Sequence, residues 1–138
     1  MYHNNIVVAL VCQKDEIPMI DEAVKYAISL NAKLTAVHVN PEHAGEISMM
    51  MESAGKLITE NDIRKLFREA GHSEIASVMD VRIVTGEPIY SEIVKLATDA
   101  NLLILGHRRQ STFKEFFFDS IDEGIINRVN CPVLVVPK

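Results

Sequence analysis

Short runs of apolar, largely β-branched residues, separated by segments with helical periodicity, most restrict the fold of this 138-residue chain. Four runs are clear, at residues 6–11, 34–39, 102–105 and 133–136, and a weaker, alternating fifth run covers residues 78–84. Near-continuous apolar strands are typical of parallel sheets that are covered on both faces. The runs therefore predict a sheet of five buried strands.

The segments between the runs carry apolar residues at the i, i+3, i+4 spacing of an amphipathic helix. The stripes are Ile20, Ala23, Val24, Ala27 and Ile28; Ile89, Ile93, Leu96, Ala97 and Ala100; and Phe117, Ile121, Gly124, Ile125 and Val129. A further helix is predicted over residues 54–70, although its phase slips between Ile58 and Ile63. This alternation, with short right-handed crossovers, predicts one α/β domain over residues 1–138 with helices on both faces of an open sheet.

Composition restricts the partners and the compartment. The chain has 14 Lys+Arg against 19 Asp+Glu, a formal charge of −5, which repels nucleic acid and anionic membrane surfaces. No apolar run approaches the ~20 residues of a membrane span, and the first residues do not resemble a signal peptide. Cys12 and Cys131 lack CxxC spacing and are typical of small buried hydrophobes in a reducing cytosol. We therefore expect a cytoplasmic protein without a nucleic-acid or membrane partner.

Common catalytic and metal-binding motifs are missing from the sequence. There is no GxxxxGK[ST] loop, no GxGxxG after the first run, no GxSxG elbow, and no HExxH or HxH spacing. His38 and His43 are the nearest histidine pair, but a strand and a Pro turn separate them. Cys12 follows a strand, yet no cation precedes Lys14, so an inert thiol is favoured over a reactive one. We expect no catalytic residues and no metal site.

The segment after the fourth run contains Gly106, a polar stretch at residues 107–112, the aromatic run Phe116–Phe118 and Ser120. Together with residues 5–10, 84–88 (Val-Thr-Gly-Glu-Pro) and 131–136 (Cys-Pro-Val-Leu-Val-Val), it resembles the universal stress protein family over essentially the whole chain. The resemblance implies a five-stranded parallel sheet in the order 3-2-1-4-5, a Rossmann-like, adenine nucleotide alpha hydrolase-like fold.

Nucleotide-binding members of that family carry an Asp at the end of the first strand. They also carry Gly-x-x-Gly, nine residues and Gly-Ser/Thr after the fourth strand. Here Gly106 matches the first glycine and Ser120 the hydroxyl residue, with the nine-residue spacing intact. Arg109 and Asp119 replace the second and third glycines, and Val11 replaces the Asp. This degenerate motif resembles the universal stress protein A branch, whose members lack the nucleotide-binding glycines.

The altered residues also argue against phosphate binding on physical grounds. Asp119 precedes the last helix, where it is a favoured N-cap, so its carboxylate can fill the anion site of the helix. Asp122 and Glu123 in the first turn add charge of the same sign. Asp15 lies four residues after Val11, up to ~14 Å away when extended, and is a poor substitute for the missing Asp. We therefore predict that the chain does not bind ATP in the family manner.

An alternative reading keeps an anion or nucleotide site for ATP or AMP, since arginine forks bind phosphate well. If a nucleotide or anion is bound, the candidate residues are Gly106, Ser120, Val39, Arg108 and Arg109. The competing interpretation of the two arginines is that they pair with Asp119 and its neighbours or face solvent. A small nucleotide hydrolase is the third hypothesis.

The last run, Val133, Leu134, Val135 and Val136, lies on the sheet edge in the expected strand order. It contains no charge and is bracketed by Pro132 and Pro137, which favours a short two-fold pairing over an open fibre. The family resemblance likewise implies homodimers joined through the fifth strands. The alternative is an edge covered by the chain's own N-terminus.

Phe116–Phe118 spans too wide a helical arc for one core face, which points to a lid, the second subunit or another protein. We expect a non-enzymatic, homodimeric stress-response protein with an unidentified protein partner.

Overall fold

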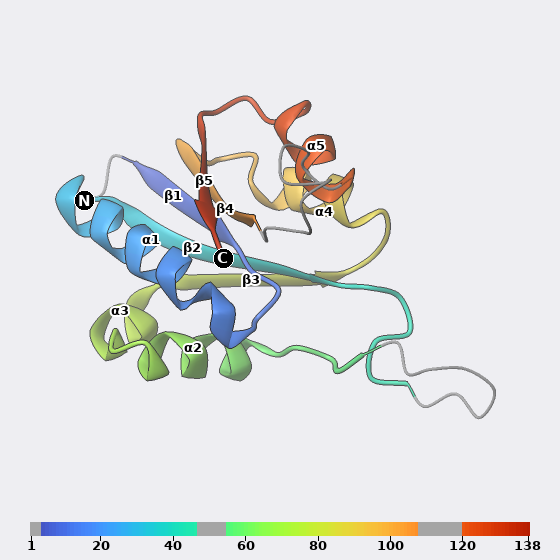
Figure 1. Cartoon of the computed structure of the whole chain (residues 1–138), viewed down its shortest axis with the longest axis horizontal. Helices are drawn as coiled ribbons and strands as arrows, with labels where there is room; N and C mark the ends of the chain where they lie inside the picture. The colour runs from blue at the N-terminus through green and yellow to red at the C-terminus, as the bar shows by residue number, and fades with distance from the viewer. Residues whose placement is uncertain (1–3, 47–54, 108–119) are drawn as a thin grey trace.

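A five-stranded parallel sheet forms the centre of the protein in the order β3-β2-β1-β4-β5 (Figure 1). The structure is a computed structural model that describes residues 4–46, 55–107 and 120–138. The strands are β1 (Asn5–Ala9), β2 (Lys33–Asn40), β3 (Asp80–Thr85), β4 (Leu102–His107) and β5 (Val133–Pro137). The strand order expected from the family resemblance is therefore confirmed.

Helices cover both faces of the sheet, as the periodicity predicts (Figure 1). They are α1 (Ile17–Ser29), α2 (Glu60–Glu69), α3 (Ser73–Val78), α4 (Ile89–Leu96) and α5 (Ser120–Ile126), with a short 3-10 helix η1 (Lys14–Glu16) before α1. One buried cluster joins the sheet to α1, α2 and α3, and a second joins it to α4 and α5. Within the described residues, no helix combines the length and apolar character needed to cross a membrane.

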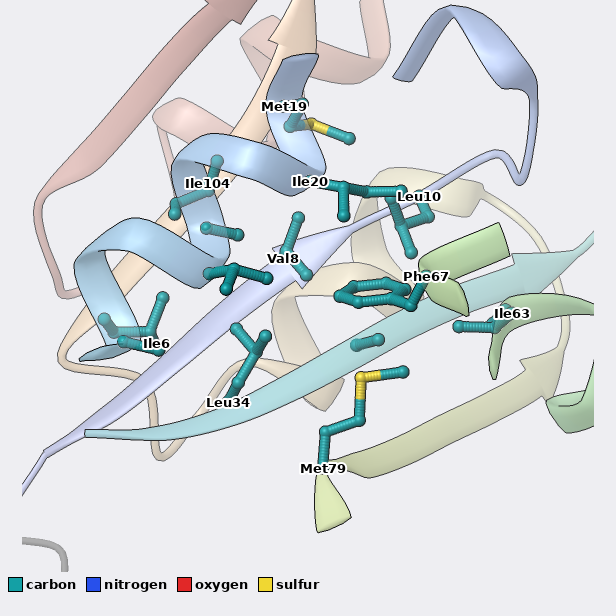
Figure 2. Close-up of a cluster of buried hydrophobic side chains, with 14 of the residues drawn as sticks. Ile6, Val8, Leu10, Met19, Ile20, Leu34, Ile63, Phe67, Met79 and Ile104 are labelled. Atoms are coloured by element: carbon teal, nitrogen blue, oxygen red, sulfur yellow. The ribbon is translucent and has the colours of Figure 1, made fainter. Parts of the chain in front are cut away.

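Alternating side chains of each strand enter the two clusters. In β1 and just after it, Ile6, Val8 and Leu10 face the α1–α3 side, whereas Val7 faces α4 and α5. Figure 2 shows the first cluster, in which the Phe67 ring from α2 lies between the sheet and its helices. Burying an aromatic side chain of this size contributes roughly 1.5–3 kcal/mol. Polar residues of β1 and β2 are also buried, namely Asn5, Thr35, His38 and Asn40. Each of them makes hydrogen bonds within the protein; Thr35 Oγ1, for example, donates to Asn5 Oδ1 at 2.8 Å.

The helix predicted over residues 54–70 begins later, at Glu60. Thr59 is its N-cap: the Asp62 backbone N–H donates to Thr59 Oγ1, and the Thr59 N–H donates to Asp62 Oδ2 at 2.9 Å. This reciprocal cap starts the helix at a defined residue. Ile58 therefore lies outside the helix, which explains the phase slip between Ile58 and Ile63 in the sequence pattern.

The prediction of a single helix between the second and third strands was also wrong, because α3 follows α2. Arg64 of α2 donates hydrogen bonds to the carbonyl oxygens of Ala76 and Met79, so a tertiary contact holds this six-residue helix. Val78, predicted to begin a strand, ends α3 and is 74% exposed. The third strand begins at Asp80 instead.

The first predicted strand and the last predicted helix end differently from the pattern. β1 ends at Ala9 rather than Val11, because Cys12 adopts a left-handed conformation with φ 68° and turns the chain. In the last helical stripe, Val129 lies beyond α5, which ends at Ile126. Phe117 and the rest of the aromatic run lie outside the described residues.

Candidate functional site

The candidate site lies at the carboxyl ends of β1, β2 and β4. In open α/β sheets this edge receives ligands at the point where the winding reverses, here between β1 and β4. A cavity of about 100 Å³ opens there. Its walls come from both sides of the sheet and consist of Ala9, Leu10, Val11, Glu16, His38, Val39, Ile89, Ile93, Leu105, Ile121, Asp122, Ile125 and Lys138.

Glu16 supplies a fully buried carboxylate to this cavity, with only 1% of the residue exposed. The loop after β1 folds around it: the backbone N–H groups of Val11 and Gln13 donate to Oε2 and Oε1, each at 3.0 Å. The ammonium of Lys138 lies 3.2 Å from Oε2. Three contacts therefore hold the carboxylate in one orientation.

Lys138 reaches Glu16 by crossing Gly106. Its backbone N–H donates to the carbonyl oxygen of His107 at 2.8 Å, which continues the pairing of β4 and β5 by one residue. A Cβ atom built on Gly106 would collide with Lys138 Cε and lie 3.1 Å from Met19 Sδ. A side chain at residue 106 would thus require the end of the lysine chain to shift from its place beside Glu16.

His38 and Asn40 form the hydrogen-bonded wall at the end of β2. His38 Nδ1 lies 2.6 Å from the Leu10 carbonyl oxygen, and Nε2 lies 3.1 Å from Asn40 Oδ1. The Asn40 amide is fixed by Ile58, since Oδ1 accepts from the Ile58 N–H and Nδ2 donates to its carbonyl oxygen, both at 3.0 Å. Both ring nitrogens therefore lie against oxygen atoms, and the ring is held from two sides.

Asp122 faces inward from the first turn of α5 and is buried. Its Oδ2 lies 3.4 Å from His107 Nδ1. Glu123 is exposed. Of the two carboxylates predicted to repel phosphate, Asp122 thus belongs to the cavity wall and Glu123 faces outward.

The sequence-predicted candidates fall into two groups. The first group is described by the structure: Gly106 lies beneath Lys138, and Val39 is buried in the cavity wall at the end of β2. Ser120 is the first residue of α5. Nothing is described of its side chain, and Arg108, Arg109, Asp119 and Phe116–Phe118 lie outside the described residues.

Sequence reasoning missed the two central residues of the site, Glu16 and Lys138. From the sequence, Asp15 is a poor substitute for the carboxylate missing at Val11, whereas in the structure the next residue, Glu16, accepts the Val11 N–H. The acid three residues after Gln13, at the start of the first helical segment, was a usable signal. Lys138 carried no comparable signal, because its position depends on the β4–β5 pairing.

Both cysteines are free, and they are partly rather than completely buried, each packed against one of the two hydrophobic clusters. Burial, with the nearby charges of Asp62 and Glu16, raises the pKa of the Cys12 thiol to about 11. Burial also raises the pKa of Cys131. The thiolate, which is the reactive form, is therefore scarce at neutral pH.

The metal-binding residue types do not converge on one point in the part of the chain that the structure describes. No group of three or more His, Cys, Asp or Glu side chains there could hold a metal ion. His43 is exposed and lies 2.9 Å from Glu46, whereas His38 is buried against Leu10 and Asn40. The two histidines thus contact different partners.

Comparison with known proteins agrees with this architecture. The model of the universal stress protein family matches residues 2–137. The chain belongs to the universal stress protein family. A curated universal stress protein of Methanocaldococcus jannaschii is 33% identical over 99 residues, which are 70% of this chain and 57% of that protein. The match therefore spans little more than half of that relative.

Solved structures show the same fold at low sequence identity. A universal stress protein in complex with cAMP superimposes with a TM-score of 0.65 at 24% identity, covering 99% of this chain and 98% of that one. The universal stress protein of Archaeoglobus fulgidus in complex with dAMP gives a TM-score of 0.63 at 19% identity, covering 99% of both chains. These likenesses establish the fold of the chain.

Proposed function

We propose that this universal stress protein is a non-enzymatic, homodimeric stress-response protein of the universal stress protein A type, which does not bind ATP in the family manner. The observation that carries the proposal is that side chains of the protein itself fill the end of the sheet. The remaining cavity of about 100 Å³ is well below the roughly 300–1,000 Å³ of ordinary small-molecule sites.

The charges in the cavity support the same conclusion. The carboxylates of Glu16 and Asp122 both line it, and Glu16 is neutralised by Lys138. A nucleotide that entered would have to displace Lys138 and would bring phosphate charge near an unpaired buried carboxylate. Two like charges about 4 Å apart repel by roughly 4 kcal/mol at intermediate screening. The chain therefore favours its own ion pair over an anionic ligand.

Titration calorimetry of the wild-type protein with ATP, AMP and cAMP tests the proposal. No heat of binding is expected at micromolar concentrations of nucleotide, and no phosphate release is expected from ATP. Saturable micromolar binding of any of the three would refute it. That result would favour the alternative, a nucleotide-dependent regulator that uses Gly106, Ser120, Val39, Arg108 and Arg109. This alternative is supported by structural neighbours that were solved in complex with cAMP and dAMP.

The homodimer is proposed to form through β5, which is the last strand in the sheet order. Val133, Leu134 and Val135 are only partly buried in the single chain, and an unpaired apolar edge favours strand pairing. Sedimentation velocity should give the mass of two chains for the wild type and of one chain for Val135→Lys. Val78→Lys, at an exposed residue on another element, is the matched control and should remain dimeric. A monomeric wild type would refute this part of the proposal.

A further inference from the structure

We infer that Glu16 and its surrounding loop form a binding site for a primary ammonium group, and that Lys138 occupies this site as an internal ligand. The inference deepens the proposed function and rests on it, since both require that the cavity holds a cation rather than a phosphate. It goes further in naming the chemical class that the site accepts.

The carboxylate is positioned by the backbone rather than by the lysine. Oε1 accepts from the Gln13 N–H and Oε2 from the Val11 N–H, both at 3.0 Å, and the Glu16 N–H donates to the Gln13 carbonyl oxygen at 3.0 Å. None of these three contacts involves an atom of Lys138. The loop thus presents a preformed anionic acceptor at 1% exposure, and a carboxylate removed from water favours a cationic hydrogen-bond donor.

The shape of the site fits an unbranched alkylammonium. The Lys138 chain runs over Gly106, where its Cγ and Cε and the Met19 sulfur are the nearest atoms, and its ammonium ends 3.2 Å from Glu16 Oε2. The walls beside it are largely apolar, with Leu10, Val39 and Leu105 lining the same cavity. A largely apolar wall beside a buried carboxylate matches an alkyl chain that ends in an ammonium group.

The other charged and polar groups around the cavity agree with a cation of this size. Asp122 also lines the cavity, and its carboxylate lies 3.4 Å from His107 Nδ1, while His38 contacts Leu10 and Asn40. A phosphate would face two carboxylates. A compact ammonium with three donors can bond to Glu16 and leave the His38 wall undisturbed.

The experiment replaces the internal ligand with a free one. In Lys138→Ala, the missing atoms are three methylenes and the ammonium, which are the atoms of n-propylammonium. We expect n-propylammonium chloride to raise the melting temperature of Lys138→Ala saturably, with half-saturation on the order of 1–100 mM for so small a ligand. Controls at equal ionic strength are tetramethylammonium chloride, which lacks N–H donors, and n-propanol with sodium chloride, which lacks the charge.

Two further proteins test whether the response to n-propylammonium comes from the site at Glu16. The wild type should show no saturable shift, because Lys138 competes at high effective concentration. The double variant Glu16→Gln, Lys138→Ala should lose the response to n-propylammonium. Equal shifts with tetramethylammonium, or an unchanged response in the double variant, would overturn the inference. Nucleotide binding by the wild type tests the proposed function separately, because it does not depend on the response of Lys138→Ala to an amine.

A measurement on the intact wild type covers the case in which Lys138→Ala does not fold. Trace acetylation of lysines, followed by mass spectrometry, should modify Lys138 about tenfold or more slowly than Lys56. The Lys138 side chain is 10% exposed and that of Lys56 is 72% exposed. Glu16→Gln should accelerate acetylation of Lys138 and leave Lys56 unchanged. Equal rates for the two lysines in the wild type would overturn the inference.

Discussion

Replacing Glu16 with Gln tests how much the buried ion pair contributes to stability. Glutamine keeps the shape of the side chain but presents one acceptor and one donor where the carboxylate presents two acceptors. The best orientation places the carbonyl oxygen at the position of Oε2, where it still accepts from the Val11 N–H and contacts Lys138. The NH₂ group then faces the Gln13 N–H, which loses its acceptor.

The magnitude follows from these two losses. A buried N–H without an acceptor costs about 1–3 kcal/mol. Breaking a fully buried ion pair costs about 3–5 kcal/mol, but the Lys138 side chain is 10% exposed and can turn towards water, so only part of that cost applies. We expect Glu16→Gln to lower the free energy of unfolding by about 2–4 kcal/mol. For a domain of this size, each kcal/mol corresponds to about 3–4 °C in the melting temperature.

Urea unfolding followed by circular dichroism measures this loss. A double-mutant cycle with Lys138→Met, which keeps the alkyl chain and removes the charge, should give a coupling energy of about 1–2 kcal/mol. The matched control is Glu60→Gln, because Glu60 pairs with Arg64 at the surface with 57% of its side chain exposed. That change should cost no more than about 1 kcal/mol. A loss below about 1 kcal/mol for Glu16→Gln, or a coupling energy near zero, would refute the reasoning.

Three other measurements test separate parts of the structure. Thr59→Ala removes the N-cap of α2 and should lower the free energy of unfolding by about 1 kcal/mol in urea; no change would contradict the capping argument. In a Cys131→Ser background, the rate at which Cys12 reacts with iodoacetamide should keep rising up to about pH 11, the pKa set by burial, whereas a plateau below about pH 9 would show an ordinary thiol. The Arg82 guanidinium lowers the pKa of Asp99 below 3.8, so this pair stabilises the fold above that pH and its contribution disappears as the pH falls through the lowered pKa. Asp99→Asn should therefore cost up to about 1 kcal/mol at neutral pH and nothing in strong acid, and an equal cost at both would count against the ion pair.

The fold was predictable from the sequence because its signal is local and repeated. Each apolar run is long enough for a buried strand, and the stripes between the runs have one helical period. The limits of the elements were less predictable, because they depend on contacts that a periodic pattern does not contain. Thr59 and Asp62 set the start of α2 through a cap, and Arg64 holds α3 through two carbonyl groups of a later segment.

The location of the candidate site could be predicted from the sequence, but the charged residues that form it could not. The carboxyl ends of β1, β2 and β4 follow from the strand order, and Val39 and Gly106 were correctly placed at those ends. The spacing of the family motif indicates candidate residues after β4. Glu16 lies outside that motif, and its carboxylate matters because the loop after β1 turns back on itself at Cys12. Such a turn is set by the tertiary structure.

Gly106 shows why a matched motif residue need not have the function of the motif. A glycine in a phosphate loop is required because a ligand approaches the backbone closely. Here the atom nearest to a Cβ built on residue 106 is Lys138 Cε, so a side chain of the protein itself lies against this backbone. A sequence pattern records only that a side chain is excluded, and not what excludes it. Lys138 is held over Gly106 by its ion pair with the buried carboxylate of Glu16, so the ammonium site that we propose rests on Glu16 rather than on the glycine.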